Sequence, residues 1–199
     1  KRRAIYVIYS FCRICDDIAD GELPKESKLE QLEQISEIFQ KSSLQKPAIH
    51  NEVFLAVEDV ISKYKIPKKY FIEFVDGMIM DQKINSFENF SELELYCYRV
   101  ASVVGLMCLE IFGYHGKKYE VFGYAKKLGI AMQLTNIIRD IKDDIKRDRI
   151  YIPRSEMSEF GYEEKQLREL RYSENFYALI VFQIQRIRSF FDASSESNQ

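Results

Sequence analysis

Apolar residues recur every three to four positions along most of the chain, which is the spacing of an α-helix. The pattern predicts helices at about residues 2–20, 27–41, 50–64, 67–85, 91–113, 117–145, 163–171 and 173–192. Glycine and proline mark the breaks, at 21–24, 46–47, 66–67, 113–116 and 151–153. No strand-like alternation competes with this pattern. We therefore expect a single all-α domain over residues 1–199.

The helix predicted at 2–20 is apolar on most of its circumference. At about 100° per residue, its apolar side chains cover an arc of about 160°, against the roughly 100° stripe that a surface helix needs. The opposite arc of about 100° holds Tyr9, Arg13, Asp16, Asp17 and Asp20. A helix of this kind should be covered by protein on most sides, so its charges need an explanation.

The segment from Gln133 to Pro153 repeats the arrangement. One arc of about 140° holds Gln133, Asn136, Arg139, Asp140, Asp143, Asp144 and Arg147. In both helices two aspartates are four residues apart, so each pair lies one turn apart on one face. A single such helix would be explained by a solvated face with local ion pairs. The repeated spacing in two apolar helices favours a shared site.

Two facing pairs of carboxylates repel each other unless a cation lies between them. Magnesium suits such a site because it takes a few carboxylates, keeps water and binds substrate phosphates. The arginines in both stripes would then donate to phosphate oxygens. Two reaction classes use this arrangement, namely nucleotide hydrolysis by all-α pyrophosphatases and loss of diphosphate from an allylic carbon. The second class also needs an apolar cavity.

Composition narrows the possible classes of protein further. Apolar residues make up 46% and charged residues 30%, and the net charge of -2 does not indicate a nucleic-acid binder. We expect no membrane-spanning run and no secretory signal. Cys12 and Cys15 form a C-x-x-C pair, but Cys97 and Cys108 are not spaced as a second zinc-binding pair. Core cysteines in a reducing cytoplasm are the better interpretation.

Four stretches together carry a family resemblance. "YSFCRICDDIAD" resembles the first aspartate-rich motif of the squalene/phytoene synthase family, Y-x-x-C-R-x-x-D-D-x-x-D. "QLTNIIRDIKDDIKRDRIYIP" is similar to the second, Q-x-x-N-x-x-R-D-x-x-x-D followed by R-I-Y-x-P. Between them, "FVDGMIMDQ" and "YCYRVASVVG" look like the acidic helix and the helix beside the reacting carbons. The resemblance runs from Lys1 to about Phe160.

The resemblance implies an isoprenoid synthase fold, with the two motif helices facing each other across a central cavity. It implies a prenyl transferase that joins two prenyl diphosphates head to head, with Mg²⁺ as cofactor and Mn²⁺ as a substitute. Farnesyl diphosphate is the favoured substrate and geranylgeranyl diphosphate the alternative. The reaction would pass through a cyclopropylcarbinyl diphosphate to a squalene-, dehydrosqualene- or phytoene-type product. The use of NADPH is left open.

The same resemblance assigns roles to individual residues. The metal-side carboxylates would be Asp16, Asp17, Asp20, Asp140 and Asp144. The contacts to diphosphate, metal or the reacting centre would be Tyr9, Arg13, Tyr96, Gln133, Asn136 and Arg139. Ala101 and Gly105 would line the prenyl channel, although close helix packing explains such small residues at least as well. Asp76 and Asp81 are further candidates. The basic flap, Lys146–Arg149 with the following Tyr151-Ile152-Pro153, would close over the phosphates and exclude water, with a solvated run of charges as the equal alternative.

Other interpretations remain at this point. A head-to-tail prenyl elongase shares the fold and the acidic helices, and a nucleotide pyrophosphatase or a non-enzymatic assembly partner is a further alternative. We expect the domain to be incomplete at both ends, because the family has an upstream helix and longer C-terminal helices. We also expect a cytoplasmic location, with peripheral association at the inner face of the membrane as a variant. The oligomeric state is undetermined.

Overall fold

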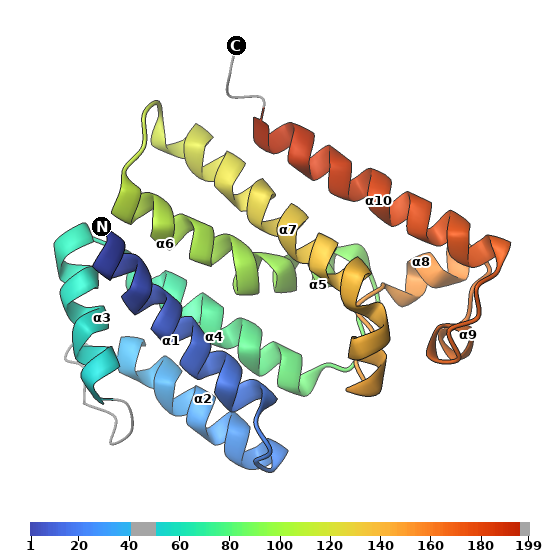
Figure 1. Cartoon of the computed structure of the whole chain (residues 1–199), viewed down its shortest axis with the longest axis horizontal. Coiled ribbons are helices and arrows are strands. Elements are labelled where there is room, and N and C mark those ends of the chain that lie inside the picture. The colour runs from blue at the N-terminus through green and yellow to red at the C-terminus, as the bar shows by residue number, and fades with distance from the viewer. Residues whose placement is uncertain (41–50, 196–199) are drawn as a thin grey trace.

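The computed structural model describes residues 1–40 and 51–195, and it is helical almost throughout (Figure 1). The elements are α1 (Arg2–Asp20), α2 (Lys25–Gln40), α3 (Asn51–Tyr64), α4 (Lys68–Lys83), α5 (Phe90–Cys97), the π-helical segment η1 (Tyr98–Ser102), α6 (Val103–Phe112), α7 (Lys118–Lys146), α8 (Arg154–Glu159), α9 (Glu164–Arg168) and α10 (Glu174–Ser195). Within the described residues the one extended pairing is an isolated parallel bridge between Ser86 and Ile150. The predicted all-α class is confirmed.

The predicted helices correspond closely to the observed ones. The predicted helix over 91–113 is observed as α5, η1 and α6 in direct succession, and the predicted 163–171 is the shorter α9. Helix α8 escaped prediction because it has six residues, too few for a periodicity to show. The predicted break at 46–47 and the adjoining helix ends at 41 and 50 lie outside the described residues.

The first four helices enclose an aromatic core. Helix α1 packs against α2, α3, α4 and α6, as its wide apolar arc requires. Phe11 is fully buried at the centre, with ring centroids 5.1 Å from Phe71 and 5.5 Å from Phe39. This packing fixes the rotation of α1, and with it the direction of its aspartates.

The stretch Phe90–Phe112 lies at the middle of the molecule. Its 23 residues are apolar enough to cross a membrane by length and composition, which contradicts the expectation that no such run exists. In this fold the stretch is packed between α4 and α7, so its apolar character serves the core. A core helix of a water-soluble domain passes the same test.

Two glycines let the neighbouring helices approach the π-helical segment. A Cβ at Gly77 of α4 would lie 2.8 Å from Val100 Cγ1, and a Cβ at Gly129 of α7 would lie 2.5 Å from Ser102 Cα. Ser102 Oγ also donates to the Lys126 carbonyl at 2.7 Å. The wider π turn is thus clamped from both sides. Such single π turns occur frequently at functional sites.

After α7 the chain turns back and runs along the segment that joins α4 to α5. The Ile150 amide donates to the Asn85 carbonyl at 2.9 Å, and the Arg154 amide donates to the Phe87 carbonyl at 2.9 Å. Helix α10 then packs along α7 and forms one side of the molecule (Figure 1). These contacts hold the predicted flap, residues 146–153, against the rest of the fold.

Candidate active site

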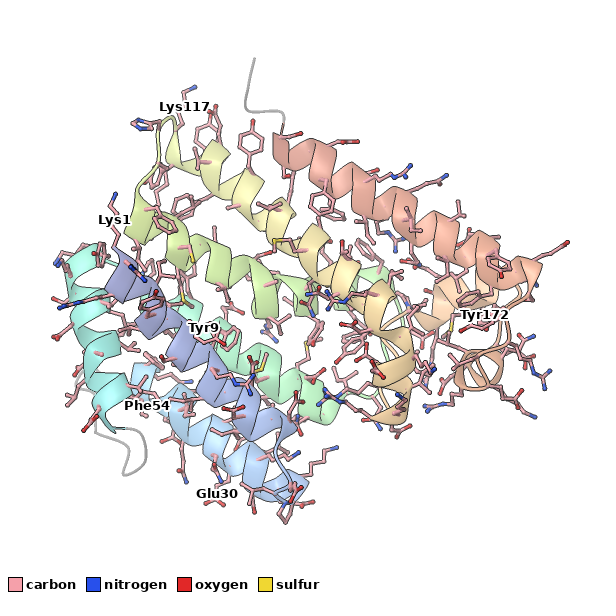
Figure 2. The ribbon with its side chains drawn as sticks, in the orientation of Figure 1. Lys1, Tyr9, Glu30, Phe54, Lys117 and Tyr172 are labelled. Atoms are coloured by element: carbon pink, nitrogen blue, oxygen red, sulfur yellow. The ribbon has the colours of Figure 1, made fainter. Side chains whose placement is uncertain are left out.

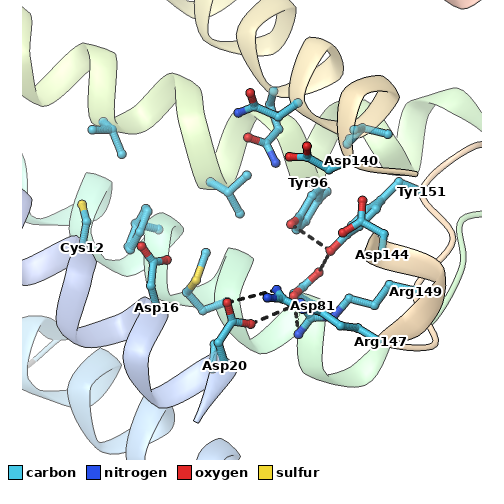
Figure 3. A pocket seen from close by; sticks show the side chains of 18 residues that line it. Cys12, Asp16, Asp20, Asp81, Tyr96, Asp140, Asp144, Arg147, Arg149 and Tyr151 are labelled. Carbon is cyan, nitrogen blue, oxygen red and sulfur yellow. Dashed lines mark hydrogen bonds and ion pairs between the residues drawn. The ribbon is translucent and has the colours of Figure 1, made fainter. Parts of the chain in front are cut away.

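A cavity of about 350 Å³ lies between the two aspartate-bearing helices (Figure 3). Helices α1, α4 and α7, the α5–η1–α6 stretch and the segment after α7 all contribute to its wall. The lining residues are Cys12, Asp16, Ala19, Asp20, Phe74, Met78, Asp81, Tyr96, Val100, Val104, Gln133, Asn136, Ile137, Asp140, Asp144, Arg147, Arg149 and Tyr151. One part of this wall is acidic and another is apolar.

The two predicted pairs of carboxylates face this one cavity from different helices. Asp16 and Asp20 enter from α1, and Asp140 and Asp144 enter from α7 (Figure 3). Each pair is one turn apart on its helix, so both members point to the same side. The predicted facing arrangement of the two motif helices is therefore present in the structure.

The electrostatics of these carboxylates show that their negative charge is incompletely neutralised. Burial, reinforced by the charge of Asp20, raises the pKa of Asp16 to about 6. Burial, reinforced by Asp140, raises the pKa of Asp144 to about 6 as well. Arg139 donates two hydrogen bonds to Asp140 at 2.7 and 2.6 Å and lowers the pKa of that carboxyl. A cation between the walls would relieve the repulsion.

Asp81 of α4 is the centre of a buried polar network. Its carboxylate accepts a hydrogen bond from Tyr151 Oη at 2.5 Å and forms an ion pair with Arg149 Nη2 at 2.9 Å. Tyr96 Oη in turn donates to Tyr151 Oη at 3.4 Å. Burial raises the pKa of Asp81, and Arg149 and Tyr151 oppose that effect. The network joins α4 and α5 to the segment after α7.

Two arginines connect that segment to α1. Arg147 Nη1 and Arg149 Nη1 lie 3.3 and 3.4 Å from the two carboxylate oxygens of Asp20. The Arg149 side chain is only 16% exposed, because it is held by both Asp81 and Asp20. These arginines bring ten guanidinium N–H donors of fixed geometry close to the acidic walls. Together with the side-chain amides of Gln133 and Asn136, which also line the cavity, they are donors for an anionic ligand.

The donor set fits divalent cations that keep part of their water shell. Among residues 1–40 and 51–195, no three His, Cys, Asp or Glu side chains converge closely enough to hold an ion by themselves. Each wall instead offers a carboxylate pair made only of oxygen donors. Magnesium needs only one or two carboxylates when water and phosphate oxygens complete its octahedron. The residues therefore suit an ion that enters together with a diphosphate.

Several predicted site residues are not among the residues that line the cavity. Tyr9 is 67% exposed (Figure 2), and Arg13 forms an exposed ion pair with Asp17 at 2.9 Å. Arg139 is likewise an exposed side chain that contacts Asp140. The prediction assigned most of the polar arc of each helix to the site, but it left out Asp143. Arg139 lies at the edge of its polar arc that is farthest from Asp144, which agrees with its exposure. Tyr9 lies between Asp16 and Asp20 on the wheel of α1, so rotation about the helix axis does not explain its exposure.

The two predicted channel residues do not line this cavity, and their role in a prenyl channel stays a prediction. Val100 and Val104 line the cavity, whereas Ala101 and Gly105 do not. A Cβ at Gly105 would face the Ala125 carbonyl of α7 at 3.8 Å, so Gly105 lies at a helix contact. Of the two further candidates, Asp81 lines the cavity and Asp76 does not.

The prediction missed the individual parts played by Arg147, Arg149 and Tyr151. It treated residues 146–153 as a flap that would close over phosphates, and the structure has this segment already docked on Asp20 and Asp81. The R-x-R-I-Y sequence directly after the second acidic pair was the available signal. Its partners on α1 and α4 are distant in sequence, so only the fold identifies them. The four cysteines are free. Cys15 and Cys97 are buried as expected for core residues, whereas Cys12 and Cys108 are partly exposed and Cys12 lines the cavity.

Comparison with known proteins adds to this geometry. Residues 1–197 match the squalene/phytoene synthase family. The chain belongs to that family. It is 36% identical to a phytoene synthase of Arthrospira platensis, over 98% of this chain and 66% of the relative. It is 33% identical to a chloroplastic phytoene synthase of Narcissus pseudonarcissus, over 98% of this chain and 47% of the relative. The chain thus spans about half to two thirds of these relatives.

Solved structures of the family share the fold. The squalene synthase HpnC of Alicyclobacillus acidocaldarius superposes with a TM-score of 0.84 at 25% identity, over 97% of this chain and 71% of that one. A dehydrosqualene synthase solved with a ligand has a TM-score of 0.80 at 31% identity, over 97% of this chain and 66% of that one. The isoprenoid synthase fold expected from the sequence is therefore confirmed.

Proposed function

We propose that this protein joins two identical prenyl diphosphates head to head, in a reaction that depends on Mg²⁺ or Mn²⁺. The observation that carries the proposal is a single cavity with two facing carboxylate pairs, two arginines and an adjoining apolar wall. The family relatives named phytoene, squalene and dehydrosqualene synthase support the same reaction class. The acidic walls would receive the diphosphate and the apolar wall the hydrocarbon.

The reaction starts with cleavage of the C1–O bond of one substrate, and the electron pair leaves with the diphosphate. Arg147 and Arg149 would donate hydrogen bonds to the phosphate oxygens as this charge develops. Asp16, Asp20, Asp140 and Asp144 would hold the cation. The bound cation would supply the positive charge that makes diphosphate a good leaving group.

The allylic cation that remains must be kept from water. Its apolar surroundings here are Phe74, Met78, Val100, Val104 and Ile137. The double bond of the second substrate attacks the cation, and loss of a proton closes the cyclopropane ring. The face of Tyr96 lines the same cavity and can stabilise positive charge. Loss of the second diphosphate and rearrangement would leave a new cation. Loss of a proton from that cation would complete a dehydrosqualene- or phytoene-type hydrocarbon, whereas a squalene-type product would need a hydride from a reductant such as NADPH.

The test is incubation of the purified protein with farnesyl or geranylgeranyl diphosphate and Mg²⁺, with mass spectrometry of the extracted lipid. We expect a product that contains two joined prenyl chains, or the cyclopropyl diphosphate that precedes it. The preferred substrate decides between a squalene-type and a phytoene-type product. A single lengthened diphosphate would show head-to-tail elongation and would overturn the proposal, as would the absence of any turnover with both substrates.

A further inference from the structure

The turn that ends α7 has an unusual backbone conformation at Asp148. Its φ is +58°, in the left-handed region that glycine favours. The Asp148 amide donates to the Ile145 carbonyl at 3.0 Å, and the Arg149 amide donates to the Asp144 carbonyl at 2.9 Å. This hydrogen-bond pair is the Schellman motif, which closes many helices with glycine at this position. Here an aspartate occupies it.

The side chain of Asp148 explains why glycine is not needed. Its carboxylate accepts a hydrogen bond from Arg168 Nη1 of α9 at 2.7 Å and another from Asn85 Nδ2 at 3.2 Å. Arg168 is itself held by Glu164 at 2.8 Å. Two elements that are far apart in the sequence therefore grip the turn from outside, and Asp148 does not line the cavity. We call these two contacts the Asp148 clamp.

Asp148 lies between the two arginines that reach Asp20 from the segment after α7. The orientation of the turn sets the direction of both arginine side chains. An exposed ion pair such as that of Asp148 and Arg168 contributes little to global stability. A geometric contribution is a better explanation, because the catalytic use of an arginine depends on its exact direction.

We propose that Asp148 is a positioning residue, and that its clamp to Arg168 and Asn85 holds Arg147 and Arg149 toward the cavity. The part of this inference that concerns diphosphate rests on the proposed function. The part that concerns the conformation of the turn is independent of the proposed function. Two measurements separate them.

The first measurement is limited proteolysis of the folded protein with trypsin, which cleaves after Lys146, Arg147 and Arg149. Arg168→Gln leaves this cleavage sequence unchanged and removes the shorter and charged contact of the clamp, that of Arg168 with Asp148. Arg171→Gln is the matched control, because Arg171 pairs with Glu169 outside the turn. We expect cleavage within 146–149 to be at least about fivefold faster in Arg168→Gln, since the turn opens more often. Equal rates in both variants would overturn the clamp.

The second measurement is the affinity for inorganic diphosphate with Mg²⁺ in three variants. Asp148→Asn keeps an acceptor oxygen and tolerates positive φ, so we expect affinity within about threefold of the wild type. Asp148→Gly fits the backbone better but has no side chain, and we expect a loss of about tenfold. Asp148→Ala should lose at least as much.

The glycine variant decides between the two explanations of Asp148. If only the backbone mattered, Asp148→Gly would bind diphosphate as tightly as the wild type, and the proposal would be wrong. Wild-type protein that binds no diphosphate would instead refute the proposed function. The proteolysis comparison would still decide whether the clamp exists.

Discussion

At the scale of single residues, the position of a carboxylate around its helix separates candidates that are neighbours in sequence. Asp144 lines the cavity, whereas Asp143 is exposed and pairs with Lys146 at 2.6 Å. Asp144→Asn should lower kcat by at least about 100-fold, since it removes charge at the reacting centre. Asp143→Asn should stay near the wild type. Steady-state kinetics of both variants check the prediction, and similar rates would contradict it.

The Asp144→Asn variant should also fold normally. Burial, reinforced by repulsion from Asp140, raises the pKa of Asp144 in the native protein, so loss of the charge should not destabilise the fold. A fall in the free energy of unfolding that accounts for the lost activity would show a structural role instead. Chemical denaturation of the same preparations distinguishes the two.

Arg149 should be sensitive to the shape of its side chain as well as to its charge. Its guanidinium reaches both Asp81 and Asp20 from one position, which the ammonium group of lysine cannot do with comparable geometry. We expect Arg149→Lys to lower kcat/KM by at least about tenfold. Arg171→Lys, on the exposed surface, should leave it unchanged. Wild-type kinetics in Arg149→Lys would mean that a simple positive charge suffices.

At the scale of helices, close packing around the π-helical segment shapes the apolar wall. Gly129→Ala would bring a Cβ within 2.5 Å of the Ser102 backbone, so we expect a loss of about 1–3 kcal/mol in unfolding free energy. Gly123 lies in the same helix, and a Cβ there would meet nothing within 4 Å. Gly123→Ala should stabilise the protein by about 0.5–1 kcal/mol. Urea denaturation measures both, and equal effects would contradict this account.

Helix positions followed from local periodicity, because burial of one face is encoded every three to four residues. The identity of the residues that each helix turns toward the cavity did not follow from this periodicity. The choice of Val100 and Val104 over Ala101 and Gly105 as lining residues depends on a π turn, for which the sequence carries no periodic signal. The pairing of Arg149 with Asp81 joins residues 68 positions apart, so it depends on tertiary packing alone.

At the scale of the whole molecule, the two acidic walls couple cation binding to pH. Asp16 and Asp144 each have a pKa of about 6 in the folded protein, above the ordinary value of 3.8. The folded state therefore binds more protons than the unfolded state between about pH 4 and 6, and the contribution of these groups to stability falls as pH rises through that window. Bound cations should offset this loss above pH 6.

The same protons compete with the cation. With two carboxylates of pKa about 6, affinity for Mg²⁺ should fall roughly tenfold between pH 7.5 and 5.5. Calorimetric titration of Mg²⁺ in the presence of inorganic diphosphate at both pH values checks this. Asp16→Asn should reduce the difference, because it removes one of the two protonation sites. A pH-independent affinity would show that neither carboxylate binds the cation.

The central claim is that the carboxylate pairs of α1 and α7 act together on one diphosphate through divalent cations. The most direct test is calorimetric binding of inorganic diphosphate at pH 7.5, with Mg²⁺ and with excess chelator, in the wild type, Asp16→Asn and Asp144→Asn. We expect wild-type binding only with Mg²⁺, and a loss of at least about tenfold in each variant, because the two residues come from opposite walls of one cavity. Tight binding in chelator, or wild-type affinity in either variant, would contradict the account.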